Sequence, residues 1–259
     1  MGNTVGKLVF PTDYIEKVVN NELHDTKYIA TNRYKIPYVF IDETPDETRA
    51  VVLYNHGNAE NINTIYAGLK TMSRELAVAI VTYDYAGYGM RRLLNPEIKP
   101  SEENVYADAL TLAEYAKNVA NTRKIPFIIH GRSLGSAPAL HVAVNHQNAQ
   151  GLVLESAFRS VARTVIGGGF VHSVFDMFDN EDKLKQQKLI PTCFIHGVQD
   201  HIVPFSHGEY LYKHCMAPKE NLFVRNGDHN DLESTYKQEV YFKLDSFVHD
   251  ITQHFQRQK

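Results

Sequence analysis

Short apolar runs alternate with longer amphipathic segments along this chain, and the alternation begins near residue 50. The runs are rich in β-branched and aromatic residues, which predicts strands, whereas the segments repeat their apolar positions about every three to four residues, which predicts helices. Strands are expected at Ala50–His56, Val78–Tyr85, Pro126–His130, Gly151–Glu155, Pro191–His196 and Asn221–Arg225. Helices are expected at Asn63–Glu75, Ser101–Ala120, Leu134–His146, Ser206–His214 and Leu232–His254.

The order of these elements indicates a single α/β domain. Two earlier runs, Tyr28–Arg33 and Lys35–Ile41, predict an antiparallel hairpin at one edge of the sheet. Near-continuous apolar strands are typical of a parallel sheet that helices cover on both faces, and alternating strands and helices give right-handed crossovers. We therefore expect a mostly parallel, doubly wound sheet over residues 26–259, with a minimal lid, and an N-terminal extension over residues 1–25.

The composition is that of an ordinary folded protein, with 43% hydrophobic and 22% charged residues. This excludes a disordered chain, a collagen-like chain and a disulfide scaffold. The formal net charge is -3 and the longest basic run is the pair Arg91-Arg92, so no nucleic-acid partner is expected. Two cysteines, Cys193 and Cys215, without a secretory signal favour a reducing, cytoplasmic location. No apolar stretch approaches the roughly 18 residues that a membrane span needs.

The first residues raise the question of a lipid anchor. Removal of Met1 would expose Gly2, and the segment Met1–Lys7 is similar to an N-myristoylation signal, although Gly6 stands where Ser or Thr is preferred. The alternative is a chance glycine at an ordinary chain end. Because one myristoyl chain binds membranes only marginally, lipidation of Gly2 would predict reversible, peripheral membrane association.

The loops at the carboxyl ends of the strands are where ligands bind in an open α/β sheet. One of them reads Gly131-Arg132-Ser133-Leu134-Gly135, the G-x-S-x-G form in which a serine occupies a tight turn between a strand and a helix. An apolar strand precedes it, and a helix start rich in small residues follows. This context predicts that Ser133 is a nucleophile, and the alternative is a glycine-rich turn with an incidental serine.

A serine hydroxyl is a poor nucleophile until a base takes its proton, and that base needs a carboxylate to orient it. Asp200 lies just past the strand Pro191–His196, and His229 follows the last strand, which is the chain order Ser, Asp, His of a hydrolase fold. Asp228 and Asp231 flank His229 and remain alternatives, either as the acid or, for Asp231, as the N-cap of the next helix.

The chain has 13 histidines, so other roles for them need weighing. His56, His130 and His196 end strands and are interpreted as packing or local hydrogen-bonding residues, and His201 as solvated. A metal site from His196, Asp200, His201 and His229 is conceivable, but no spacing matches a zinc signature, so no metal is predicted. No dinucleotide or phosphate-loop motif is complete, so no cofactor is implied.

Acyl transfer also needs donors for the developing oxyanion. The N–H of Leu134, directly after Ser133, and the N–H of Asn58, in the loop after the strand Ala50–His56, are the predicted donors. Substrate-binding residues are expected at Gly57, Tyr85, Arg132 and Phe170. The last of these belongs to the apolar segment Val165–Phe178, which is either a short helix packed on the sheet, the interpretation we favour, or a contact for an acyl chain or a membrane.

With these residues assembled, the chain resembles the α/β-hydrolase superfamily, from about Tyr28 to the C-terminal helix. More narrowly, it resembles the α/β-hydrolase-domain 17 group of protein depalmitoylases. The matching stretches are His56–Ala59, Tyr83–Gly89, Pro100–Glu102, Gly131–Gly135, Phe178–Asn180, His196–Gly197, Asp200, Ile202–Pro204, Ser206–Gly208 and His229–Asp231. The resemblance implies that Ser133, Asp200 and His229 form a catalytic triad that hydrolyses esters or thioesters, including fatty-acyl thioesters on proteins.

Two departures from that group change what is expected. Its members carry an N-terminal cysteine cluster for membrane attachment, whereas Met1–Asn20 contains no cysteine. The segment Met90–Lys99 is longer than the corresponding loop of the family, and we expect it to reshape the substrate mouth. The sequence thus predicts a serine hydrolase for an acyl ester or thioester, with an acylated protein among the candidate substrates. Two alternatives stay open: a peptidase of the same fold, and a non-catalytic binding protein.

Overall fold

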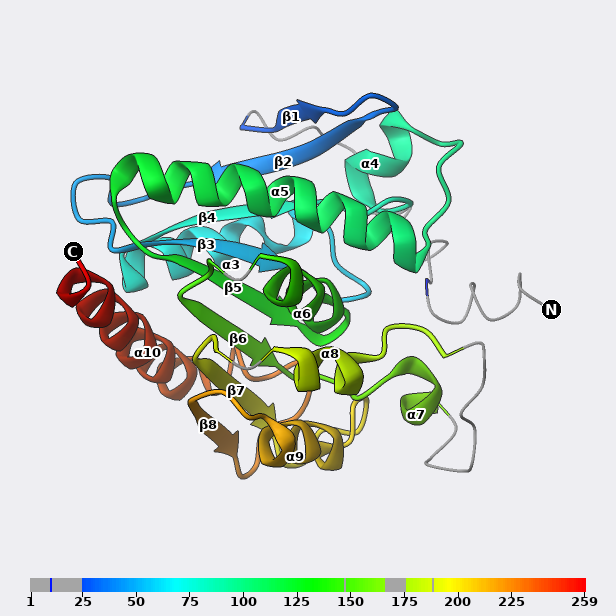
Figure 1. The fold of residues 1–259 in the computed structure, drawn as a ribbon. Coiled ribbons are helices and arrows are strands. Elements are labelled where there is room, and N and C mark those ends of the chain that lie inside the picture. The colour runs from blue at the N-terminus through cyan, green and yellow to red at the C-terminus, as the bar shows by residue number, and fades with distance from the viewer. Residues whose placement is uncertain (1–9, 11–24, 147, 166–175, 188) are drawn as a thin grey trace.

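The structure is a computed structural model that describes residues 10, 25–146, 148–165, 176–187 and 189–259. Within these residues, an eight-stranded sheet has the order β1-β2-β4-β3-β5-β6-β7-β8 (Figure 1). The strands are Lys27–Ala30 (β1), Lys35–Ile41 (β2), Ala50–Asn55 (β3), Val78–Tyr83 (β4), Phe127–Arg132 (β5), Gly151–Glu155 (β6), Thr192–Gly197 (β7) and Lys219–Val224 (β8).

The pairing of the strands confirms the predicted mostly parallel sheet with a hairpin at one edge. β1 pairs with β2 and β2 with β4 in antiparallel fashion, and every pair from β4 to β8 is parallel. In the central register, Leu53 of β3 lies between Val81 of β4 and Ile129 of β5. The carboxyl ends of β3, β5, β6 and β7 therefore meet at one edge of the sheet, on the right in Figure 1.

Helices cover both faces of the sheet and divide the core into two layers. They are Ile62–Leu76 (α3), Gly89–Leu94 (α4), Glu102–Arg123 (α5), Ser136–Asn145 (α6), Val161–Val165 (α7), Asn180–Gln186 (α8), Phe205–His214 (α9) and Lys237–Arg257 (α10). One layer contains buried residues of α5, α6, α8 and α9, and the other contains those of α3 and α10. Along β3, Val51 and Leu53 face the first layer while Val52 and Tyr54 face the second, because successive strand side chains point to opposite faces.

The last helix begins later than its sequence pattern predicts. It was expected from Leu232 with Asp231 as its N-cap, but it begins at Lys237. The Asp231 carboxylate instead accepts the N–H of Asp228 at 2.7 Å. Asp231 thereby stabilises the loop that carries His229, and the chain turns once more before the helix starts.

Three short helices, α4, α7 and α8, lie in segments for which the pattern predicted no helix, since none of them is long enough to show a helical period. α4 occupies the start of the segment Met90–Lys99, whose Arg91 is fully buried in an ion pair with Asp108. α8 is capped by Asp179, which accepts the N–H of Asp182. The longer loop expected to reshape the substrate mouth is therefore partly helical.

Several expectations fall outside the described residues. Gly2, Phe170 and most of the lid segment are among them, and the division of the chain at residues 25 and 26 stays a prediction. Phe10, from the expected extension, is 2% exposed and packs edge-on against Tyr88 and Phe178. In the part of the chain that the structure describes, no helix is long and apolar enough to cross a membrane.

Candidate active site

The turn after β5 places Ser133 in a strained backbone conformation. Its φ is +51°, in the left-handed region that non-glycine residues rarely occupy. A short 3₁₀ turn, Ser133–Gly135, then leads into α6. Such strain is of the order of 1–3 kcal/mol and persists only where the surrounding structure holds it.

The two glycines of the motif allow this turn to pack tightly. A Cβ on Gly131 would overlap the carbonyl of Gly135, and a Cβ on Gly135 would overlap the carbonyl of Asn55. The serine turn and the loop after β3 are therefore in direct backbone contact. Because that loop continues to Asn58, the contact brings the segments of both predicted oxyanion donors, Asn58 and Leu134, together.

The structure brings Ser133, His229 and Asp200 into one line of contacts. Nδ1 of His229 lies 2.7 Å from Oδ2 of Asp200, and Nε2 of His229 lies 3.0 Å from Oγ of Ser133. A carboxylate only accepts hydrogen bonds, so Nδ1 carries the ring hydrogen and Nε2 is left to accept the serine hydroxyl. All three residues are less than 10% exposed.

Asp200 is held in its ionised form. Burial by itself raises the pKa of this carboxyl, but hydrogen bonds from His196 and His229 and from the N–H of Val203 lower that pKa well below its usual value. The N–H groups of Ile202 and Val203 donate to Oδ1 at 2.9 and 2.7 Å. Both carboxylate oxygens are therefore in use, which fixes the side chain in position.

Asp228 and Asp231, the acids that flank His229, contact main-chain groups of this loop rather than the imidazole of His229. Asp228 Oδ1 accepts the N–H of His229 at 2.6 Å, and Asp231 accepts the N–H of Asp228. These two carboxylates hold the histidine loop, and of the three acids weighed from the sequence it is Asp200 that meets the ring.

The other histidines form the local contacts that their strand-end positions predict. His56 Nδ1 lies 2.8 Å from the carbonyl of Gly57, and His130 Nε2 lies 3.1 Å from Glu155. His196 Nε2 lies 2.9 Å from the carbonyl of Val203. Among the described residues, no three His, Cys, Asp or Glu side chains are grouped so that they could hold a metal ion.

The described residues expected to bind substrate have side chains or backbones that face other parts of the protein. Tyr85 is fully buried, its ring stacks on His56 at 4.0 Å between centroids, and its hydroxyl donates to the carbonyl of His56. Arg132 is 9% exposed, and its guanidinium donates to protein groups. A Cβ on Gly57 would meet Arg132 and Glu60 at 3.0 Å. Tyr85, Arg132 and Gly57 thus contact other parts of the protein, and their direct contact with substrate stays a prediction.

Asn180 was missed as a site residue, although it stands in one of the stretches that carry the family resemblance. Its side-chain Nδ2 donates to Ser136 Oγ at 3.0 Å and to the carbonyl of Phe158 at 2.9 Å. Ser136 Oγ in turn donates to the carbonyl of Ser133 at 2.7 Å. Because Asn180 is fully buried, it ties α8 to the turn that carries the serine.

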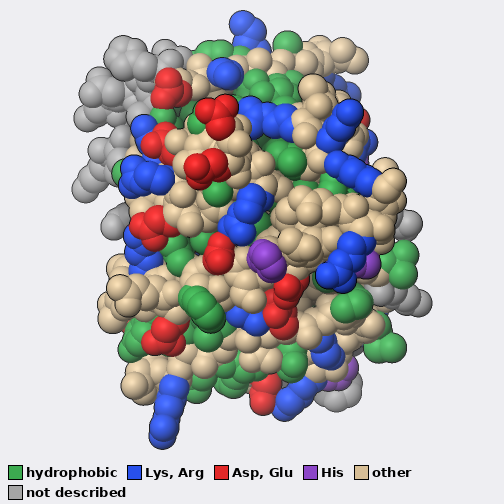
Figure 2. Space-filling view, turned by 90° about the vertical axis from the view of Figure 1, so that its left-hand side faces the viewer, with side chains coloured by type: hydrophobic (Ala, Val, Ile, Leu, Met, Phe, Trp, Pro, Cys, Tyr) green, Lys and Arg blue, Asp and Glu red, His purple; other side chains and the backbone are tan. Residues whose placement is uncertain are grey.

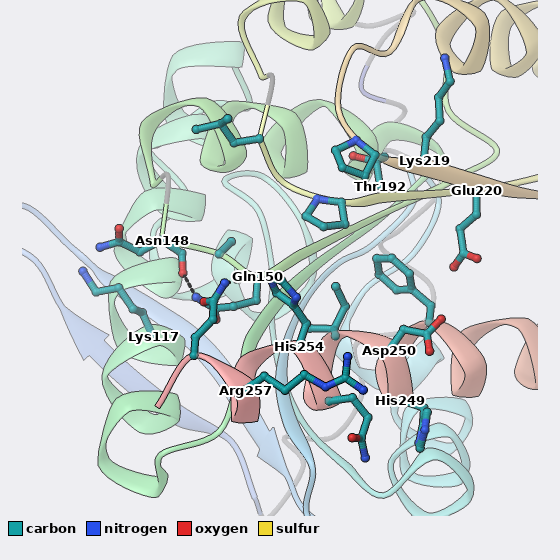
Figure 3. A pocket seen from close by; sticks show the side chains of 18 of the residues that line it. Lys117, Asn148, Gln150, Thr192, Lys219, Glu220, His249, Asp250, His254 and Arg257 are labelled. Carbon is teal, nitrogen blue, oxygen red and sulfur yellow. Dashed lines mark hydrogen bonds between the residues drawn. The ribbon is translucent and has the colours of Figure 1, made fainter.

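A large cleft lies at the opposite edge of the sheet, away from these residues. It has a volume of about 1110 Å³ and is lined by the amino ends of β7 and β8, the turn before β6, and α5 and α10 (Figure 3). On this side of the molecule, positive and negative side chains are interspersed (Figure 2). Six-residue strands are roughly 20 Å long, so this cleft does not open onto Ser133.

Comparison with known proteins gives consistent results. A family model described as serine aminopeptidase, S33, matches residues 46–168. The chain is 30% identical over 228 residues to the α/β-hydrolase domain-containing protein aho-3 of Caenorhabditis elegans, which covers 88% of this chain and 66% of that protein. It is 30% identical over 199 residues to the α/β-hydrolase domain-containing protein 17B of Homo sapiens, and the match covers 77% of this chain and 66% of that protein. The matched part thus spans slightly less than two thirds of the length of these relatives.

Solved structures share the fold at low sequence identity. A soluble variant of monoglyceride lipase from Saccharomyces cerevisiae superposes with a TM-score of 0.69 at 16% identity, covering 90% of this chain and 97% of that one. The esterase Pf2001 of Pyrococcus furiosus superposes with a TM-score of 0.70 at 15% identity, covering 91% and 98%. At such identities the likeness concerns the fold alone.

Proposed function

We propose that the chain is a serine hydrolase of the α/β-hydrolase superfamily, which cleaves carboxylic esters or thioesters through an acyl-enzyme on Ser133. One observation carries the proposal: a serine in a strained turn lies 3.0 Å from an imidazole whose other nitrogen lies 2.7 Å from a buried carboxylate. This geometry is what general-base activation of a serine requires.

The reaction follows from the direction of these contacts. Ser133 Oγ attacks the acyl carbonyl while Nε2 of His229 takes its proton, and Asp200 stabilises the imidazolium that forms. The N–H groups of Leu134 and Asn58 hold the oxyanion, and the leaving alcohol or thiol receives the proton from His229. A water molecule, activated by the same histidine, then hydrolyses the acyl-enzyme.

Fatty-acyl thioesters on proteins are the substrate class that we favour. The support is the likeness to the protein 17B group together with the stretches, such as Phe178–Asn180, that carry it. In this proposal the enzyme works in the cytoplasm and associates reversibly with membranes through myristoylated Gly2. Cell fractionation of Gly2→Ala tests that association, which an unchanged distribution between membrane and soluble fractions would exclude.

Labelling by a fluorophosphonate probe tests the nucleophile. The wild-type protein should be labelled on Ser133 and Ser133→Ala should not, while its circular dichroism spectrum stays unchanged. Retained labelling of Ser133→Ala would overturn the assignment. Absence of labelling in the wild type, together with absence of turnover, would favour a non-catalytic binding protein.

A substrate panel separates the two hydrolase candidates. A peptidase of the same fold is the second candidate, because the matching family model is described as a serine aminopeptidase. Acyl esters and thioesters of increasing chain length should be assayed beside aminoacyl amides on purified protein. The proposal expects turnover of the acyl substrates, whereas turnover confined to the amides would favour the peptidase.

A further inference from the structure

The guanidinium of Arg132 joins three loops of the candidate active site. Arg132 is the last residue of β5 and directly precedes Ser133. Its Nη2 donates to the carbonyl oxygen of His229 at 3.1 Å and to Oδ1 of Asn230 at 3.1 Å. Its Nη1 donates to Oε1 of Glu60, in the loop after β3. The residue next to the nucleophile is thus bonded both to the histidine loop and to the predicted oxyanion loop.

Glu60 extends this connection to the backbone of the oxyanion loop. Its second carboxylate oxygen, Oε2, accepts the N–H of Gly57 at 2.5 Å. The next peptide along the chain carries the N–H of Asn58, which is the proposed second donor to the oxyanion. Holding the Gly57 peptide in one orientation therefore restricts the direction in which the Asn58 N–H points.

Arg132 lies among other charged groups, which limits the freedom of its side chain to move. Nε of Arg132 lies 3.6 Å from Oε1 of Glu155, and the other oxygen of Glu155 contacts His130 at 3.1 Å. The Arg132 side chain is 10% exposed and that of Glu155 is fully buried. A guanidinium offers five N–H donors in a rigid plane, so it can hold several acceptors at once where a lysine ammonium would act as a single point.

We propose that Arg132 and Glu60 form a positioning pair, which sets the distances between Ser133, the His229 ring and the oxyanion donors. Neither side chain touches the substrate in this proposal, and each acts through the backbone groups that it bonds. The proposal rests on the proposed function for its catalytic consequence. Since a displacement of about 1 Å in a catalytic group can lower a rate about 100-fold, loss of the pair should lower kcat far more than it changes KM.

Steady-state kinetics of Arg132→Lys tests the proposal, with Arg159→Lys as the matched control variant. Arg159 also pairs with a glutamate, its Nε and Nη2 lying 3.0 and 2.7 Å from Oε2 of Glu181, but its guanidinium bonds none of the three loops. We expect Arg132→Lys to lower kcat for an acyl ester about 10- to 100-fold with KM changed less than about twofold. Arg159→Lys should keep kcat within about twofold of the wild type. Equal kcat in the two folded variants would overturn the proposal.

Glu60→Gln tests whether the two residues act together. The Glu60 side chain is 21% exposed, so this variant should fold even where changes to Arg132 are poorly tolerated. If Glu60 acts through Arg132, the double variant Glu60→Gln/Arg132→Lys should be no slower than the worse single variant. Losses in kcat that multiply would show that the two residues act independently and would contradict a positioning pair.

Hydrogen exchange supplies a readout that needs no turnover. In Glu60→Gln and Arg132→Lys, the amide protons of Gly57 and Asn58 should exchange with solvent about tenfold faster or more, with unchanged protection in β3 and β5. Unchanged protection at Gly57 in both variants rejects the positioning pair, whatever the wild type hydrolyses. The two proposals can also fail separately. If the amide protons of Gly57 and Asn58 exchange faster in both variants, but the wild-type protein neither hydrolyses any substrate nor is labelled by a fluorophosphonate, the positioning pair is supported and the proposed function is rejected.

Discussion

Nε2 of His196 lies 3.4 Å from Oδ2 of Asp200, the same oxygen that lies 2.7 Å from Nδ1 of His229. His196 also contacts the carbonyl of Val203 at 2.9 Å through the same nitrogen. Both neighbours of that nitrogen, Oδ2 of Asp200 and the carbonyl oxygen of Val203, are acceptors, so Nε2 of His196 carries a hydrogen and donates it toward them. One carboxylate oxygen is thus held between two imidazoles, one at the end of β7 and one in the histidine loop.

This arrangement predicts a large kinetic effect of Asp200→Asn. The amide cannot accept hydrogen bonds at both positions, so His229 loses the partner that fixes its tautomer. We expect kcat for an acyl ester to fall by about 10⁴-fold, the loss seen when a triad carboxylate is neutralised. Steady-state kinetics measures this, and His196→Gln, which keeps Asp200 ionised, should lose less. A loss of less than tenfold in Asp200→Asn would show that another acid supports His229.

Glu233 predicts a pH dependence of stability. Burial, with additional repulsion from Glu155 and Glu60, raises the pKa of Glu233 to about 8. A carboxyl whose pKa is raised in the folded state binds its proton more tightly there than in the unfolded chain, so its stabilising contribution is lost as the pH rises from about 4.5 through 8. The free energy of unfolding of the wild type should fall over this range relative to Glu233→Gln.

Urea unfolding at several pH values measures that difference. Glu239→Gln is the matched control, since Glu239 is an exposed acid in the first turn of α10. The difference in stability between wild type and Glu239→Gln should vary little over the same pH range. If the difference in free energy of unfolding between the wild type and Glu233→Gln stayed constant from pH 5 to 9, the pKa of Glu233 would not be raised in the folded protein.

The ion pair between Arg91 and Asp108 predicts a strong effect on stability. Nη2 of Arg91 lies 3.0 Å from Oδ1 of Asp108, and both side chains are fully buried. Asp108→Asn would leave the guanidinium buried without its counter-charge, which should lower the free energy of unfolding by about 3–5 kcal/mol. Denaturant unfolding checks this, with Glu114→Gln as a control, because Glu114 pairs with Lys117 on the exposed side of the same helix. Equal stability of the two variants would argue against a buried pair.

Gly135 and Gly68 should respond to alanine in opposite directions. A Cβ on Gly135 would overlap the carbonyl of Asn55, whereas a Cβ on Gly68 in α3 would meet nothing within 4 Å. We expect Gly135→Ala to destabilise the fold and to displace the serine turn, and Gly68→Ala to stabilise it by about 0.5–1 kcal/mol. Thermal unfolding of both variants measures these shifts. If Gly135→Ala kept wild-type stability and activity, the close backbone contact at the serine turn would be wrong.

The strands and the hairpin could be predicted from sequence because they depend on local periodicity. β2 was predicted with its observed bounds, Lys35–Ile41, and β6 likewise at Gly151–Glu155. The beginning of α10 could not be predicted in the same way. Asp231 has the side chain of an N-cap, but its carboxylate bonds the N–H of Asp228, and such competition between two local partners is decided by the loop geometry.

The chain by itself determined the candidate triad, because a glycine-flanked serine after an apolar strand, followed by Asp200 and His229 after later strands, depends only on chain order and on the edge at which parallel strands end. The part played by Arg132 was decided by tertiary structure. Its partners Glu60 and His229 are 72 and 97 residues away in the chain. No local pattern shows whether a guanidinium turns outward to a substrate or inward to such partners, since that direction depends on the burial and charge of groups that only folding brings together.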